Sequence, residues 1–112
     1  MAEKSLQDVH RFVTSVAKHQ GWVVNPDPEF LQDIEEGLRR NWNRYGYFMC
    51  PCRDSSGNKE SDSDLICPCD YNLPDQAEYG HCFCGLFLSR EFASRQIDPE
   101  PIPERRPEHL NS

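Results

Sequence analysis

Hydrophobic residues recur at helical spacing over residues 5–20. They fall on one face of a helix, with polar and charged residues between them: Leu6, Val9, Phe12, Val13 and Val16. Ser5 and Asp8 have the spacing of a capping box, and Gly21 is a suitable C-terminal stop. The pattern predicts an amphipathic helix that serves as core scaffold.

A second helix is predicted after a linker that runs from Trp22 to Asp27. Asp27 is a good N-cap residue, and Pro28 suits the first helical turn. The apolar face of this helix again follows helical spacing: Phe30, Leu31, Ile34, Leu38 and Trp42. We expect this helix to be scaffold as well.

The helical periodicity fails after Gly46. Polar, turn-rich stretches follow, so we expect the cysteines of this region to lie on short loops. A short helix is predicted near residues 59–66 and a last helix over residues 89–96, while residues 85–88 form an apolar run. The fold class predicted is mainly α, with helices in the first half and irregular loops in the second.

Length and composition limit the size of the core. The 112 residues allow a single domain, of which 15 residues are proline or glycine and only 37% are hydrophobic. Such a diluted core benefits from a covalent or metal staple. Four prolines and many charges follow Asp98, so we expect a domain over residues 1–97 and an extended polar tail over residues 98–112.

Charge narrows the range of partners. Residues 1–20 carry charge throughout, which excludes a signal-peptide core or a membrane span there, and we expect a cytoplasmic protein without a membrane partner. The formal net charge of −7 argues against nucleic acid as the main partner. The sequence does not predict an oligomeric state.

The charge is also unevenly spread. Between Gly37 and Arg53 there are four arginines and no acid, whereas residues 54–78 carry seven acids and one lysine; the arginines are Arg39, Arg40, Arg44 and Arg53. Ordinary surface patterning explains this distribution. This is the interpretation that the sequence alone favours, and a positive docking surface beside the first cysteine pair, suited to an acidic electron donor, is the alternative.

All six cysteines occur in Cys-x-Cys pairs, separated by stretches of 14 and 12 residues: Cys50-Pro51-Cys52, Cys67-Pro68-Cys69 and Cys82-Phe83-Cys84. In an extended segment, residues i and i+2 project to the same side, about 6.5 Å apart. That span suits two different iron atoms, or one ligand beside one free thiol, better than a single tetrahedral ion.

The cysteines alone leave several alternatives open. A secreted scaffold with three disulfides disagrees with the charged N-terminal segment. A structural zinc site with four or six thiolates is compatible with the count, and so is an iron–sulfur electron carrier. An iron–sulfur cluster held by four thiolates leaves two cysteines over, and two thiols beside a redox centre indicate a dithiol/disulfide couple.

The triple cysteine motif resembles the catalytic chain of ferredoxin:thioredoxin reductase. The similarity extends to the residues before the first pair, Arg44-Tyr-Gly-Tyr-Phe-Met-Cys-Pro-Cys-Arg53, to Gly21-Trp-Val-Val-Asn-Pro-Asp27 and to Cys84-Gly-Leu-Phe-Leu88. It covers roughly residues 6–93. It implies helices and irregular loops wrapped around an iron–sulfur cluster.

The resemblance also implies a role for each cysteine. Four would bind a [4Fe–4S] cluster, namely Cys50, Cys67, Cys69 and Cys82. The two others, Cys52 and Cys84, would form a redox-active disulfide beside it. Cys52 would attack the disulfide of the partner, and Cys84 would resolve the mixed disulfide. Apart from the resemblance, the adjacent Arg53 is a candidate to lower the pKa of Cys52, and an arginine that points into solvent is the alternative. The activity implied is disulfide reduction with electrons accepted one at a time.

The chain departs from the photosynthetic members of that family. Their third motif carries a histidine that manages protons, whereas this chain has Phe83 there. His81 is the candidate to substitute for it, and a merely solvated histidine on a polar loop is the alternative. The spacing between the motifs and the longer polar tail also differ. We therefore expect a non-photosynthetic type, with ferredoxin or a rubredoxin-like protein as donor and thioredoxin or a glutaredoxin-like protein as acceptor.

Overall fold

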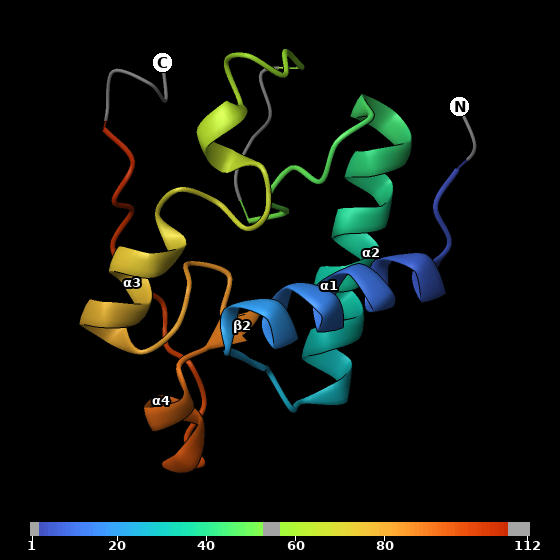
Figure 1. The fold of residues 1–112 in the computed structure, drawn as a ribbon. Helices are drawn as coiled ribbons and strands as arrows, with labels where there is room; N and C mark the ends of the chain where they lie inside the picture. The colour runs from blue at the N-terminus through green and yellow to red at the C-terminus, as the bar shows by residue number, and fades with distance from the viewer. Residues whose placement is uncertain (1–2, 53–56, 108–112) are drawn as a thin grey trace.

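Two long helices form the scaffold of the fold (Figure 1). The computed structural model describes residues 3–52 and 57–107. Within them the elements are α1 (Leu6–Gln20), β1 (Val23–Val24), α2 (Pro28–Tyr45), the short 3-10 helix η1 (Ser63–Leu65), α3 (Asn72–Tyr79), β2 (Phe87–Leu88) and α4 (Arg90–Ser94). The expected mainly helical fold class is confirmed for this part of the chain.

Both scaffold helices begin and end where their capping residues predict. The Ser5 hydroxyl accepts a hydrogen bond from the Asp8 backbone N–H and the Asp8 carboxylate accepts one from Ser5, which completes a capping box. Gly21 ends α1 in the left-handed conformation, with φ 78°. The Asp27 carboxylate caps α2, and Pro28 occupies its first turn.

The core lies where α1 packs across α2 (Figure 1). Val9, Val13 and Leu38 are fully buried there. The Phe48 ring stacks on Phe12 with the ring centroids 4.2 Å apart, so the chain after α2 returns to the α1 side. The predicted apolar faces of both helices are therefore confirmed as core.

The segment predicted as a linker contains a strand. Val23 and Val24 of β1 pair antiparallel with Leu88 and Phe87 of β2. The Asn25 side chain continues this contact by donating a hydrogen bond to the Gly85 carbonyl at 2.9 Å. The prediction of a simple linker was wrong, since this pairing fixes the third cysteine motif to the helical scaffold.

The structure corrects the two short helices predicted in the second half. Over residues 59–66 it has only η1, because the Asn58 side chain accepts hydrogen bonds from two backbone N–H groups and holds a turn in place of a longer helix. The predicted last helix is shorter, since α4 begins after Ser89 and ends at Ser94, before Gln96 with its φ of 56°.

Helix α3 was not predicted at all. Its buried residues are the polar Asn72, Asp75 and Gln76, whereas Leu73 is 62% exposed. Hydrophobic periodicity detects helices that bury apolar residues, so it gives no signal for this one. The helix lies between the second and third cysteine motifs.

The C-terminal segment packs against the second half of the fold, although residues 97–107 have no regular secondary structure. The buried Arg106 side chain donates to Asp64 at 2.8 Å and to the Ser61 carbonyl at 3.1 Å. Arg105 donates to the fully buried Asp75 at 2.8 Å. Two arginines thus hold this segment to η1 and α3.

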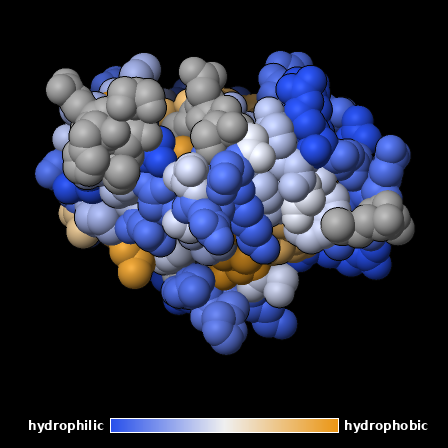
Figure 2. Space-filling model, turned by 90° about the horizontal axis from the view of Figure 1, so that it is seen from above, coloured by the Kyte–Doolittle hydropathy of each residue, from blue (hydrophilic) through white to orange (hydrophobic). Residues whose placement is uncertain are grey.

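The described surface is largely polar. Figure 2 shows one face that is mostly hydrophilic, with hydrophobic residues confined to small areas. No helix within residues 3–52 and 57–107 has the length and apolar character needed to cross a membrane.

Candidate functional site

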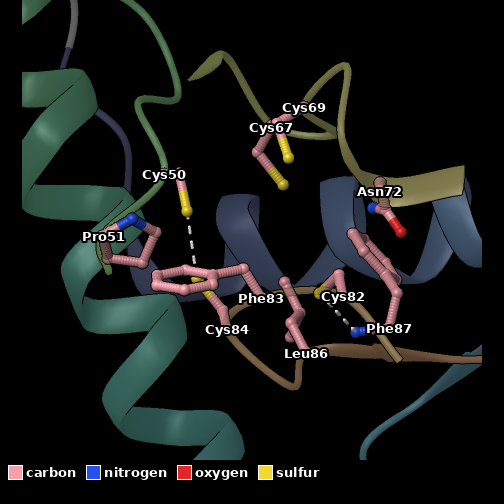
Figure 3. A pocket seen from close by; sticks show the side chains of 10 residues that line it. All are labelled: Cys50, Pro51, Cys67, Cys69, Asn72, Cys82, Phe83, Cys84, Leu86 and Phe87. Carbon is pink, nitrogen blue, oxygen red and sulfur yellow. Dashed lines mark hydrogen bonds between the residues drawn. The ribbon is translucent and has the colours of Figure 1, made fainter. Parts of the chain in front are cut away.

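Five of the six cysteines line one pocket, which the three motifs form together (Figure 3). Its cavity volume is about 20 Å³, and the space between its walls, open solvent included, is about 310 Å³. Its wall consists of Cys50, Pro51, Cys67, Cys69, Asn72, Cys82, Phe83, Cys84, Leu86 and Phe87. Almost all of this lining is sulfur and hydrocarbon.

Backbone pairing brings the first and second motifs together. Met49 and Ile66 form an isolated antiparallel bridge. On either side of it, the Cys50 N–H donates to the Leu65 carbonyl at 3.0 Å and the Cys67 N–H donates to the Phe48 carbonyl at 2.7 Å. The two Cys-Pro-Cys motifs therefore face each other across a short ladder.

Helix α2 supports the first motif directly. A Cβ atom at Gly37 would lie only 2.6 Å from the Pro51 ring, so only glycine permits this approach. One turn further on, the Asn41 side chain donates to the Met49 carbonyl at 2.8 Å. These contacts hold the first motif against the helical scaffold.

The third motif forms a tight turn before β2. The Gly85 N–H donates to the Cys82 carbonyl at 2.9 Å, and Gly85 has a positive φ of 75°. The Phe87 N–H approaches the Cys82 sulfur at 3.4 Å. Because β2 is paired with β1, the turn presents Cys82 to the pocket from the side of the core.

Cys84 lies at the centre of the sulfur contacts. Its Sγ atom is 3.0 Å from the Sγ atom of Cys50. Hydrogen bonds with Cys50 and with Cys52, followed by burial, raise the pKa of the Cys84 thiol well above its usual value. Cys52 is exposed, and none of the six cysteines forms a disulfide in this structure.

Burial also raises the pKa of two other thiols in the pocket. The pKa of Cys67 is raised well above its usual value, first by burial and then by the neighbouring cysteines. Burial raises the pKa of Cys82 to about 11, although a hydrogen bond from the Phe87 backbone opposes the shift. Several thiolates so close together are costly unless a positive centre neutralises them.

The pocket offers thiol donors from all three motifs. Among the described residues, no three His, Cys, Asp or Glu side chains converge closely enough to hold one metal ion. An iron–sulfur cluster has no such requirement, since each thiolate binds a different iron at the corner of a larger unit. Thiol donors in an apolar pocket fit the cluster that the resemblance implies.

His81 occupies a buried position in place of the expected polar loop. It is 3% exposed, its Nδ1 atom is 2.8 Å from the Cys82 carbonyl oxygen, and its ring meets the edge of Phe92. It lines a second pocket that Cys84 and Phe83 also line, and Pro99 and Ile102 of the C-terminal segment close that pocket. His81 therefore lines this second pocket and not the first.

The arginines of α2 differ in their environments. Arg39 forms an ion pair with Glu36, and the hydrogen bond that it donates to Glu36 raises the pKa of the guanidinium. Arg40 and Arg44 are exposed. They follow Gly37 at helical spacing, so they lie on the side of α2 that supports the first motif. Arg53 lies outside the described residues.

Two residues that shape the pocket were not recognised in the sequence. Asn72 reaches it from α3, a helix without an apolar face, and Gly37 acts only through the space that it leaves for Pro51. A glycine in the middle of an amphipathic helix is unusual, and this was the sequence signal for the close approach of Pro51 to Gly37.

Comparison with known proteins gives a consistent family. Residues 1–106 match the family described as ferredoxin thioredoxin reductase catalytic beta chain. The chain is 32% identical to the ferredoxin-thioredoxin reductase catalytic chain of Pyropia yezoensis over 108 residues, which cover 91% of this chain and 90% of that protein.

Two further relatives carry the same description. The catalytic chain of Porphyra purpurea is 32% identical over 107 residues, covering 90% of this chain and 87% of the relative. The chloroplastic catalytic chain of Arabidopsis thaliana is 29% identical over 98 residues, which cover 84% of this chain and 64% of that protein. The protein belongs to the ferredoxin-thioredoxin reductase catalytic chain family, a family of oxidoreductases.

Proposed function

We propose that this chain reduces the disulfide of thioredoxin or a related protein, with electrons that ferredoxin or a similar low-potential donor delivers one at a time. The observation that carries the proposal is the position of Cys84. Its sulfur lies between an exposed thiol, Cys52, and a pocket lined by four further cysteines. A structural zinc module or a simple electron carrier gains nothing from such a pair.

In this proposal, four thiolates hold a [4Fe–4S] cluster in the first pocket: Cys50, Cys67, Cys69 and Cys82. Each of the three motifs contributes at least one of them, so the cluster would join the loops that the chain brings together here. When bound, the cluster supplies a store for single electrons next to Cys84. The loops would then be wrapped around it.

Cys52 and Cys84 perform the exchange chemistry. Two electrons and two protons convert their disulfide into two thiols. The Cys52 thiolate then attacks the partner's disulfide, forms a mixed disulfide and releases one partner thiolate. The Cys84 thiolate attacks the Cys52 sulfur of that mixed disulfide, which restores the Cys52–Cys84 bond and releases the partner as a dithiol.

Exposure supports this division of roles. Cys52 is exposed, as an attacking thiol must be, whereas Cys84 is only partly exposed. The driving force is sufficient, because plant-type ferredoxins lie near −400 mV and thioredoxin near −270 mV. The difference of roughly 130 mV corresponds to about 6 kcal/mol for two electrons.

His81 is proposed to exchange a proton with Cys84. Its Nδ1–H donates to the Cys82 carbonyl, which leaves Nε2 as the nitrogen without a hydrogen bond from the described residues. His81 and Cys84 line the same second pocket. A neutral imidazole there has a free lone pair that can accept a proton from a thiol.

A trapping experiment tests the proposed exchange. The Cys84→Ser variant keeps the attacking thiol but lacks the resolving one, so it should accumulate a mixed disulfide with oxidised thioredoxin, visible as a reducible adduct on a gel. The Cys52→Ser variant is the matched control and should form none. Adducts through Cys84 in the control, or none in either variant, would overturn the assignment of Cys52 as nucleophile.

A further inference from the structure

The Asn72 side chain is a polar group in the otherwise apolar, sulfur-rich wall of the first pocket. The residue is 3% exposed and lies in the first turn of α3, three residues after Cys69. In Figure 3 its side chain lies beside the cysteines of the second and third motifs. A polar group in this position requires a partner or incurs a desolvation cost.

Only one end of the amide has a partner within the protein. The Gln76 Nε2 atom donates to Asn72 Oδ1 at 2.6 Å, one helical turn away. The Nδ2 atom donates no hydrogen bond to any residue that the structure describes. Among the described residues, Asp75 Oδ2 is the one side-chain nitrogen or oxygen that has neither a hydrogen-bond partner nor contact with open space. Asn72 Nδ2, which also has no partner among these residues, therefore borders open space.

The contact with Gln76 orients the amide. Because Oδ1 is held by Gln76, the nitrogen is the end turned toward the cysteine sulfurs, as Figure 3 shows. The opposite orientation would direct an oxygen lone pair at electron-rich sulfur. An N–H donor faces a thiolate or a sulfide favourably, so the chemistry of the wall agrees with this orientation.

We propose that Asn72 donates a hydrogen bond from Nδ2 to a sulfur of the iron–sulfur centre and thereby raises its reduction potential. The inference rests on the proposed function, since it requires a cluster in the first pocket. A hydrogen bond to a cluster sulfur stabilises the more negative, reduced state, which is one of the ways in which a protein adjusts such a potential. Asn72 is therefore a positioning and tuning residue, not a ligand.

The location of α3 strengthens this assignment. The helix is also held by Arg105, which donates to the buried Asp75 at 2.8 Å and to Glu78 at 3.2 Å. The Asn72 backbone N–H donates to the Cys69 carbonyl at 3.1 Å, so the amide and the second motif move as a unit. A donor fixed in this way loses little entropy on bonding to sulfur.

The test compares the wild type with Asn72→Leu and Asn72→Asp, all purified anaerobically with equal iron and sulfide content. The leucine removes the donor without adding charge, and the aspartate keeps the shape and the bond from Gln76. Asn43→Leu is the control, since the Asn43 amide bonds the Lys4 backbone and does not line the pocket.

Resonance Raman spectra in H₂O and D₂O report the hydrogen bond directly, and an anaerobic redox titration reports the potential. We expect the deuterium-sensitive shift of an iron–sulfur stretching band to disappear in both Asn72 variants. Their reduction equilibrium should become three- to tenfold less favourable, where tenfold equals 59 mV for one electron. The control should match the wild type in both readouts.

Different results would overturn the proposed function and the role of Asn72. A wild-type protein without iron and sulfide would overturn the proposed function. A loaded wild type whose spectra and potential match those of both Asn72 variants would overturn only the role of Asn72. Loss of iron in both variants would also overturn that role, because a tuning donor is not needed to hold the cluster.

Discussion

Cys84 contacts thiols of the first motif on both sides of Pro51. Its sulfur lies 3.0 Å from Cys50 and also forms a hydrogen bond with Cys52. The two contacts have different meanings in the proposed site, since one partner is a cluster ligand and the other is the nucleophile. The proposed function therefore depends on which of the two cysteines binds the cluster and which one attacks the partner's disulfide.

Cys50 and Cys52 form a matched pair for substitution, because they differ by two positions and by exposure. Cys52→Ser should keep the cluster and lose all thioredoxin reduction, since it removes the attacking thiolate. Cys50→Ser should lose iron and colour, since it removes a ligand. Iron content, the visible spectrum and turnover check both variants.

The reverse result would contradict the assignment. If Cys52→Ser lost its iron while Cys50→Ser kept its iron but released no thiols on reduction, the disulfide would have to join Cys50 and Cys84. The distance between those two sulfurs makes this the specific alternative to exclude.

At the scale of elements, the C-terminal segment is fixed by charge more than by apolar contacts. Arg106 is buried, and its side chain reaches Asp64 in η1. Burial alone would raise the pKa of Asp64, but hydrogen bonds from Arg106 and Tyr71 outweigh it and leave the pKa below its ordinary value. Asp64 is therefore ionised at neutral pH, and the pair is a true ion pair.

Arg106→Ala should lower the free energy of unfolding by about 3 kcal/mol, because it leaves Asp64 as a partly buried charge without its guanidinium. Guanidinium unfolding of the anaerobically purified protein measures the change. Arg95→Ala is the control, since Arg95 forms an exposed i,i+4 pair with Glu91 and its loss should cost less than about 0.5 kcal/mol. Equal, small effects of both variants would show that the segment is not anchored by Arg106.

The elements also show how far sequence patterns extend. Helices α1 and α2 were predicted correctly because capping residues and apolar faces are local signals. The strands β1 and β2 are two residues each and lie more than 60 positions apart, so no local pattern indicates their pairing. Helix α3 buries polar side chains, which hydrophobic periodicity does not detect.

The same limit applies to the site. The cysteine spacing and the family resemblance identified five residues of the pocket wall, namely Cys50, Cys67, Cys69, Cys82 and Cys84. Asn72 and the burial of His81 depend on how α3 and α4 pack, which is a tertiary property. The particular ligand and nucleophile roles stay predictions, as do the boundaries of the domain and tail.

At the scale of the whole molecule, the net charge of −7 conflicts with an acidic electron donor unless docking is local. Arg40 and Arg44 are exposed on α2, the helix that supports the first cysteine motif. Arg39 already pairs with Glu36 and is less available. We propose that the exposed pair guides ferredoxin to this side.

Charge reversal tests this docking surface. Arg40→Glu with Arg44→Glu should slow electron transfer from ferredoxin about tenfold at low salt, with a smaller effect at high salt. Arg11→Glu with Arg95→Glu changes the net charge equally, on α1 and at the C-terminal end of α4, and should have a much smaller effect. Stopped-flow rates that fall equally in both double variants would mean that only net charge matters.

The central claim is that four cysteines hold an iron–sulfur cluster and two form a redox-active pair. The most direct measurement is anaerobic purification followed by iron, sulfide and zinc analysis, a visible spectrum and a thiol count before and after mild reduction. We expect about four irons and four sulfides per chain, a broad absorbance near 400 nm and two thiols that appear on reduction. A colourless protein with one or two zinc ions and no thiols released on reduction would contradict the account.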